Sequence, residues 1–147
     1  MDNKTFKIDI PADNDGFVLF QCSLCSEFFK LRASECQADD VIEIHCPSCG
    51  LISDNYFTED IISLAMAMSV NYMREKLYDS FSSARSNKLV NIKANKPQYE
   101  EEYRINSGIE ALEVQKYLCC NREAKIKELY KMCGSYCPYC GVHCDGN

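Results

Sequence analysis

The feature that most constrains this chain is its cysteine content. Eleven cysteines occur in 147 residues, and two of the places where they gather share one motif, CPSCG at 46–50 and CPYCG at 137–141. Such a density is typical of a disulfide scaffold or of metal sites, and the redox compartment separates the two. Residues 1–16 are polar and acidic, unlike a signal peptide, and no run reaches the roughly 18 apolar residues of a membrane helix. We therefore expect a cytoplasmic protein without a membrane segment, whose reduced thiols bind metal.

The first candidate metal site combines two C-x2-C pairs, Cys22 with Cys25 and Cys46 with Cys49. Each pair presents both sulfurs on one side of a turn, and zinc prefers four tetrahedral ligands. In CPSCG, proline stiffens the turn, and Gly50 tolerates a left-handed conformation beyond it, which leaves backbone N–H groups free to point at the thiolates. Because four cysteines leave no coordination position for water, the set predicts a structural zinc rather than a catalytic one.

Residues 17–57, with C-x2-C, a gap of twenty residues and CPSCG, resemble a zinc ribbon of the kind found in the general transcription factor TFIIB and in many small bacterial proteins. The resemblance implies an antiparallel fold but no particular function, because ribbons serve in nucleic-acid binding, polymerase docking and protein contacts alike. Nothing after residue 57 resembles the cyclin-like repeats of that transcription factor, so a role in transcription initiation is not implied. Small proteins of this kind often accompany larger bacterial or phage machines, and this is the setting that the resemblance implies.

The second candidate site is less regular. We call each CPxCG turn a knuckle. The knuckle at Cys137 and Cys140 has its proline and glycine at the same places as the first, but the expected partners of these two cysteines, Cys119 and Cys120, are adjacent in the sequence. Neighbouring side chains of a strand point to opposite faces, so both can reach one ion only if the chain bends there. We predict a second zinc on these four cysteines, which gives two zinc ions per chain. The spare ligands that could replace one of the adjacent pair are Cys133, His143 and Cys144.

Two other residues near these motifs are expected not to bind metal. Cys36 has no pairing partner nearby and is expected to be a free thiol. His45 precedes the first knuckle and is expected to be a structural or exposed neighbour.

The pattern of the remaining chain predicts an α+β fold: a small two-module zinc protein with antiparallel zinc ribbons at both ends, joined by one long amphipathic α-helix. Strand-like segments occur at 5–10, from Phe17 into the first cysteine pair, at 27–34 and at 40–50. Strand patterns return from residue 108, in IEALEVQKYLCC and NREAKIKELYKMCGSY. The expected parts are 1–57 for an N-terminal strand and the first ribbon, 58–87 for the helix, 88–107 for a hairpin or linker, and 108–147 for the C-terminal zinc module.

The expected helix carries two apolar stripes. It is favoured by Thr58 as N-cap, by Glu59 and Asp60 in the first turn, and by the absence of Pro and Gly from 58–87. One stripe consists of Ile62, Met66, Val70, Met73, Leu77 and Phe81, and the other of Ile61, Leu64, Ala65, Met68 and Tyr72. Such a helix must be covered on more than one side. The chain itself, a second copy in a homodimer through 58–87, or a larger protein partner could supply the cover.

Net charge argues against broad attraction to nucleic acid, since it is −6. A local patch is the alternative to a solvated linker for the acid-free stretch that holds Arg85, Lys88, Lys93 and Lys96. Further basic candidates on the second module are Arg122, Lys125, Lys127 and Lys131. Aromatic residues expected to be exposed, and therefore able to stack on bases, are Phe28, Phe29, Tyr56 and Tyr139.

The sequence favours a non-enzymatic role. No cysteine pair directly precedes the expected helix, as in a thiol oxidoreductase, and neither a nucleophile motif nor a phosphate loop occurs. The run Glu100–Glu102 is interpreted as a solvated face, and no small-molecule substrate is expected. The prediction is a structural-zinc protein that acts as an interaction module or accessory subunit of a larger bacterial or phage complex. The alternative is a nucleic-acid-binding zinc ribbon that assists transcription or phage defence.

Overall fold

The computed structural model describes residues 3–84, 93–106, 108–109 and 111–146. The chain divides into two compact units. One consists of Met1–Asp9 and Glu59–Ile105, and the other of Ile10–Thr58 and Asn106–Asn147. Both cysteine-rich parts of the chain therefore belong to the same unit, and the long helix belongs to the other.

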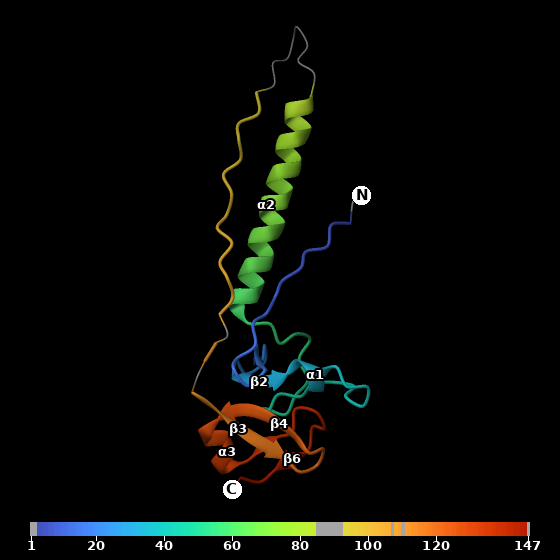
Figure 1. Ribbon diagram of the computed structural model, residues 1–147, viewed down its shortest axis with the longest axis vertical. Helices are drawn as coiled ribbons and strands as arrows, with labels where there is room; N and C mark the ends of the chain where they lie inside the picture. Colours follow the sequence, from blue (N-terminus) through green and yellow to red (C-terminus); the bar gives the residue numbers. More distant parts are fainter. Residues whose placement is uncertain (1–2, 85–92, 107, 110, 147) are drawn as a thin grey trace. The chain divides into compact units, whose positions relative to one another are not determined.

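A four-stranded antiparallel sheet organises the cysteine-rich unit (Figure 1). Its strands, in order across the sheet, are β1 (Phe17–Gln21), β2 (Phe28–Arg32), β4 (Arg122–Lys127) and β3 (Leu112–Tyr117). The hairpins β1–β2 and β3–β4 meet at the centre, where β2 pairs with β4. The sequence predicts a separate module on either side of the helix, and the pairing of β2 with β4 differs from that expectation because it joins the two parts in one sheet.

The two halves of this unit repeat the same order of elements. Each hairpin is followed by a short helix, which is α1 (Ala33–Cys36) in the first half and α3 (Glu128–Cys133) in the second. A CPxCG knuckle comes next in each half, and the second knuckle is flanked by β5 (Ser135–Tyr136) and β6 (His143–Cys144), which pair with each other. Helix α3 was not predicted, because the segment 121–136 was interpreted as continuous strand.

Two other predicted strands do not form. Residues 5–10 contain no strand, and within 40–50 the structure has only an isolated bridge between His45 and Ile52. The backbone of the second segment is hydrogen-bonded elsewhere: the Ile44 carbonyl accepts a bond from the Tyr56 hydroxyl at 2.5 Å. The amide of Val41 closes a turn onto the carbonyl of Ala38. Alternating hydrophobicity was therefore misleading here, because these backbone groups serve turns and tertiary contacts.

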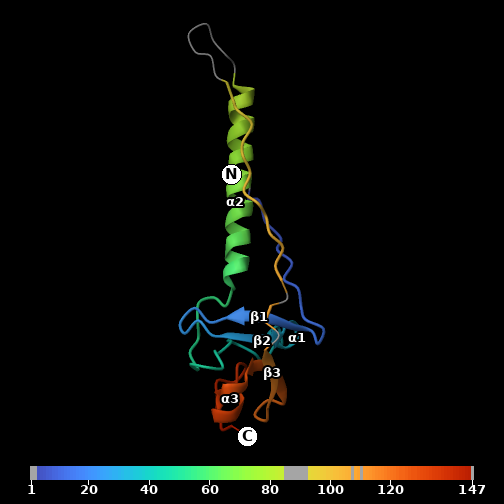
Figure 2. The same cartoon turned by 90° about the vertical axis from the view of Figure 1, so that its left-hand side faces the viewer.

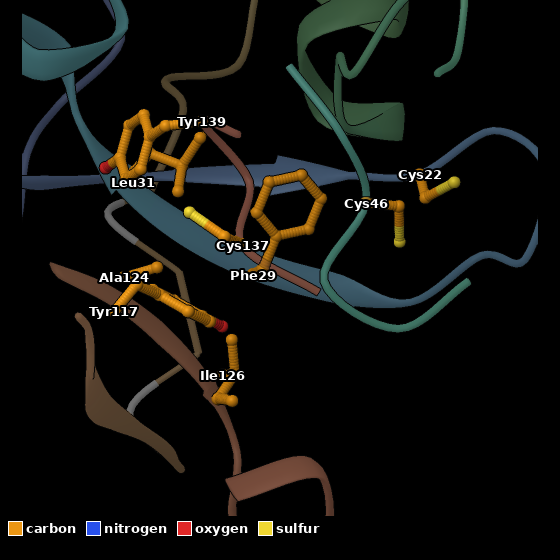
Figure 3. Packing of buried hydrophobic residues seen from close by; sticks show 9 residues of the cluster. All are labelled: Cys22, Phe29, Leu31, Cys46, Tyr117, Ala124, Ile126, Cys137 and Tyr139. Carbon is orange, nitrogen blue, oxygen red and sulfur yellow. The ribbon is translucent and has the colours of Figure 1, made fainter. Parts of the chain in front are cut away.

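Side chains from both hairpins and both knuckles form one buried core (Figure 3). Phe29 of β2 stacks on Phe20 with ring centroids 5.8 Å apart and meets the Tyr56 ring edge-on at 5.7 Å. Tyr139 of the second knuckle reaches back to the first half, where its hydroxyl lies 3.0 Å from the Glu35 carboxylate. The buried members of the core are Cys22, Phe29, Leu31, Cys46, Tyr117, Ala124, Ile126, Cys137 and Tyr139.

A buried ion-pair cluster lies where β2 meets β4. Lys30 and Lys125 are opposite each other in the register, and both ammonium groups contact the carboxylate of Asp13, at 3.2 and 2.7 Å. Lys125 also contacts Asp15 at 2.8 Å. Hydrogen bonds from Lys125, Lys30 and backbone amides outweigh the effect of burial and hold the pKa of Asp13 well below its usual range. The turn before β1 therefore neutralises Lys30, which is buried, and Lys125, which is half-buried.

The other unit is built on helix α2 (Glu59–Ser83). It begins one residue after and ends four residues before the predicted bounds of 58–87, and residues 85–87 lie outside the described part. Residues 93–106, predicted as hairpin or linker, form no strand. In both views the segment 93–102 runs along α2 (Figures 1 and 2). Within the described residues, no helix combines the length and apolar character needed to cross a membrane.

Candidate metal centres

The first candidate centre brings together the four cysteines that the spacing singles out. The sulfurs of Cys22, Cys25, Cys46 and Cys49 all lie within 4.8 Å of one another. The Sγ atoms of Cys22 and Cys49 are 3.9 Å apart, and those of Cys25 and Cys46 are 3.6 Å apart. A tetrahedral ion with sulfur ligands at about 2.3 Å requires sulfur-to-sulfur distances of about 3.8 Å, whereas a disulfide requires about 2.05 Å. The geometry is therefore that of a four-thiolate metal site, and none of the four forms a disulfide.

Backbone amides help to organise this centre. The backbone amides of Leu24 and Cys25 favour the thiolate of Cys22, and those of Ser48 and Cys49 favour the thiolate of Cys46, because each of them acts to lower the pKa of that sulfur. Burial alone raises the pKa of both thiols. For Cys22 the amides and neighbouring sulfurs outweigh burial and lower the pKa, whereas for Cys46 burial prevails and raises it. Amide donors stabilise thiolates, and a divalent cation is what allows four of them to coexist in one buried place.

The second candidate centre consists of Cys119, Cys120, Cys137 and Cys140, whose sulfurs also lie within 4.8 Å of one another. The Sγ atoms of Cys120 and Cys137 are 3.6 Å apart. The adjacent cysteines sit in the turn between β3 and β4, and not within a strand. The bend that two adjacent ligands require is therefore supplied by the hairpin turn, and Asn121 adopts a left-handed conformation in it (φ 59°).

The two hairpin turns are equivalent residue by residue. Ser26 follows Cys25 with φ 62°, as Asn121 follows Cys120. The amide of Ser26 donates to the carbonyl of Cys22 at 2.9 Å, and the amide of Asn121 donates to the carbonyl of Tyr117 at 2.8 Å. The place of Cys22 is thus taken by Tyr117 in the second half. Its ring is fully buried, its hydroxyl lies 2.9 Å from that of Ser135, and the ligand comes instead from Cys119, two residues later.

The two CPxCG knuckles contact each other reciprocally. The amide of His45, which precedes the first knuckle, donates to the carbonyl of Pro138 at 2.8 Å. The amide of Tyr136, which precedes the second knuckle, donates to the carbonyl of Pro47 at 2.9 Å. Reciprocal bonds between equivalent residues are what a local two-fold axis produces, and the pairing of Lys30 with Lys125 obeys the same relation.

Glycine is required at the position after each knuckle. Gly50 and Gly141 have φ values of 72° and 73°. A Cβ at Gly50 would lie 2.8 Å from the ring of Tyr136, and a Cβ at Gly141 would lie 2.7 Å from the ring of His45. His45 therefore packs against the opposite knuckle, a contact that the sequence did not predict, and it lies outside the two groups of clustered cysteines.

The spare ligands stay outside both clusters. Cys133 is exposed, Cys144 pairs with Ser135 in the short sheet, and His143 packs edge-on against the Tyr136 ring at 4.9 Å. Cys36 lies apart from both clusters, and burial together with the neighbouring Glu35 raises its pKa to about 11. The raised pKa keeps the Cys36 thiol protonated near neutral pH.

The basic residues predicted as a nucleic-acid patch divide into three groups. Arg85 and Lys88 lie outside the described residues, and Lys93 and Lys96 are exposed. The four basic residues of the second module each contact a carboxylate, in the pairs Arg122–Asp40, Lys125–Asp13, Lys127–Glu27 and Lys131–Glu113. Their charges are therefore balanced within the fold.

The aromatic residues predicted to stack on bases are less exposed than expected. Phe29 and Tyr139 belong to the buried core, and Phe28 and Tyr56 are half-buried. The prediction was wrong for the two core residues because their rings fill the space between sheet and knuckles, which the sequence pattern does not reveal. These rings cannot serve as a stacking platform in the folded unit.

Comparisons with protein-family models, with curated proteins and with solved structures give no match. The structure itself shows two four-cysteine clusters, each able to hold a metal ion, in an arrangement consistent with zinc-ribbon-like modules.

Proposed function

We propose that this protein is a non-enzymatic interaction module in which two zinc ions hold the cysteine-rich unit together. Zinc is the ion that best fits four thiolates with sulfur-to-sulfur distances of 3.6 to 3.9 Å. Four protein ligands close the coordination sphere, so the metal supplies folding free energy rather than an open position for a substrate. Cys22, Cys46 and Cys137 reach zero exposure and are part of the core, which supports a structural role for the metal.

One observation carries the interaction role: helix α2 presents an apolar stripe to solvent. The side chains of Met66, Met73, Leu77 and Phe81 are 53 to 63% exposed, and Ile62 is 44% exposed. Apolar side chains are exposed singly on most proteins, but a continuous row along one helix is typical of a surface that another protein covers. A protein with these two features fits the role of an accessory subunit in a larger complex, which is the bacterial or phage setting that the ribbon resemblance suggests.

The alternative role in nucleic-acid binding has less support. Four of its candidate cations are neutralised by carboxylates, and two of its candidate rings are buried. A nucleic-acid surface needs free cations beside exposed rings, because phosphate contacts supply most of the affinity. Lys93 and Lys96 are the exposed candidates that remain in the described part of the chain.

Native mass spectrometry before and after treatment with a strong chelator tests the proposal. We expect two zinc ions per chain, and we expect that their removal exposes the amides of β1 to β4 to hydrogen exchange, because the metal supplies on the order of 10 kcal/mol or more per site. Adding zinc back should restore protection. The interaction role is checked by cross-linking capture with Leu77→Lys and, as a matched control outside the stripe, Glu75→Lys. A chelated protein that keeps its protection and melting temperature would contradict the structural role of zinc.

A further inference from the structure

The stripe of Ile62, Met66, Val70, Met73, Leu77 and Phe81 is an apolar face of α2 that the described part of the chain leaves largely exposed. At its C-terminal end, Leu77 and Phe81 line a hollow together with Lys93 and Pro97. On another face, Tyr72 meets Phe6 edge-on at 5.8 Å, and the ammonium of Lys4 lies 4.3 Å from the Tyr72 ring. On a third face, Asn71 and the backbone of Glu100 exchange hydrogen bonds of 2.9 and 2.7 Å. The second predicted stripe is buried or half-buried throughout, whereas all members of the first are exposed except half-buried Val70.

The stripe stays on one side of the helix over its whole length. Its members recur at intervals of 11 residues, as in Ile62 and Met73 or Met66 and Leu77. Eleven residues are close to three turns of an α-helix, so the row hardly drifts around a straight helix. The row spans about 28 Å at 1.5 Å per residue, which is long enough for a helix-to-helix contact of several layers.

The positions that flank the stripe on the same face are small and uncharged. Ser63, Ser69 and Ser80 lie on the same face, and no charged residue lies between Ile62 and Phe81 on it. The hydroxyls of Ser69 and Ser80 donate to the helix carbonyls four residues earlier, both at 2.8 Å. Burial of this face would therefore leave the hydroxyls of Ser69 and Ser80 paired, and the small serines permit close approach of a second helix.

The spacing identifies the partner that fits. Successive members of the stripe are separated by 4, 4, 3, 4 and 4 residues, an order that reads the same from either end. Two such helices related by a two-fold axis and running in opposite directions match in layers: Ile62 with Phe81, Met66 with Leu77, and Val70 with Met73. In each layer a larger side chain faces a smaller or more adaptable one, whereas a parallel pair would place Phe81 against Phe81.

Charge favours the same orientation. Glu59 and Asp60 occupy the first turn of α2. A parallel pair would bring four carboxylates together at one end, whereas an antiparallel pair keeps the two acidic turns apart, at opposite ends of the contact, and opposes the two helix dipoles. We infer that a second copy of this chain covers the stripe, as an antiparallel helix pair. This inference rests on the proposed interaction role and names its partner.

Charge-swap variants of the full zinc-loaded chain test the inference by sedimentation and native mass spectrometry. We expect a dimer for the natural chain and for the control Glu75→Lys. Met66→Lys alone and Leu77→Glu alone should each weaken dimerisation at least about tenfold, because each buries an unpaired charge. Mixed together, the two variants should form a heterodimer, since only the antiparallel layers place Lys at 66 opposite Glu at 77.

Each other outcome overturns a defined part of the inference. A monomer at every accessible concentration, or a dimer that both single variants leave unchanged, overturns self-association through the stripe. Loss of the dimer in both variants without rescue on mixing overturns the antiparallel orientation. The zinc count and the helical circular dichroism come from the same samples, so a folded monomer with two zinc ions refutes the dimer and leaves the zinc-stabilised module standing. A chain without bound zinc refutes the proposed function itself.

Discussion

The two cysteine clusters follow one plan but differ in how deeply their ligands are buried. In the first cluster Cys22 and Cys46 are buried and the other two are half-buried, whereas in the second only Cys137 is buried, and Cys119 and Cys140 are exposed. The difference begins in the hairpin turn, where Tyr117 fills the core position that Cys22 occupies in the first half. A four-cysteine cluster can therefore keep its fold while one cysteine moves two residues along the turn and outward to the surface.

Serine substitution at the two ligands that differ should give the largest effect. Cys22→Ser removes a fully buried ligand, and we expect loss of the first zinc and unfolding of the sheet, because a site of this kind supplies on the order of 10 kcal/mol against a total stability of about 5–15 kcal/mol. For Cys119→Ser we expect weaker binding of the second zinc with the sheet retained, since water can replace an exposed ligand. Native mass spectrometry gives the zinc count, and far-UV circular dichroism reports the fold.

Cys36→Ser is the matched control for this comparison, because this thiol lies in neither cluster and should leave both zinc ions in place. Equal zinc loss and equal unfolding in Cys22→Ser and Cys119→Ser would show that burial of the ligands does not distinguish the two sites.

The contact between the two halves is the next place to test the comparison, because within the described residues no carboxylate of the second half pairs with both lysines as Asp13 does. We expect Asp13→Asn to destabilise the unit by about 3 kcal/mol, since the buried Lys30 and the half-buried Lys125 would lose a shared carboxylate. Asp15→Asn should cost less than about 1 kcal/mol, because that carboxylate is 65% exposed. Thermal or urea unfolding of the two variants with zinc in excess measures the difference.

The pH dependence of the Asp13 effect has a definite sign. The folded state holds the pKa of Asp13 below its unfolded value of about 3.9, so the ionised form is favoured by folding. The stabilisation is fully present above that value and is lost as the pH falls toward the folded pKa. The difference between the natural chain and Asp13→Asn should therefore be constant between about pH 6 and 8. A difference that already shrinks across this interval would contradict the role of the ionised carboxylate.

The sequence predicted the ligands better than it predicted what surrounds them. The eight cysteines that meet in space are those selected by the C-x2-C pairs and the adjacent pair, because ligand spacing is local and the bend at Asn121 requires only a turn residue that tolerates a left-handed conformation. That these residues bind zinc stays a prediction. Local sequence was also enough to predict the helix, since the N-terminal signal and the absence of Pro and Gly placed both of its ends within four residues of the observed bounds.

The contacts between the halves could not be predicted, because they join residues that are about a hundred positions apart. Lys30 and Lys125 are charged and would be expected at the surface, but the pairing of β2 with β4 and the contact with Asp13 leave Lys30 buried and Lys125 half-buried. The sequence predicts Tyr139 as an exposed residue of the second knuckle, whereas in the structure its hydroxyl lies beside Glu35 of the first half. Patterns of hydrophobicity describe one segment at a time, and they do not specify which segments meet.

The smallest expected effect tests whether the two knuckles are truly equivalent. Gly50→Ala and Gly141→Ala should each destabilise the unit by about 1–3 kcal/mol, because each combines a left-handed backbone with a Cβ that meets an aromatic or imidazole ring at 2.8 or 2.7 Å. Gly16→Ala is the control for backbone strain alone, since Gly16 has a φ of 83° with no atom near its Cβ position, and it should cost about 1 kcal/mol. Urea unfolding with zinc in excess compares the three. If Gly50→Ala and Gly141→Ala lose the same stability beyond Gly16→Ala, the local two-fold relation extends to energetics; if one of them matches Gly16→Ala, its ring moves aside and the two knuckles are equivalent only in geometry.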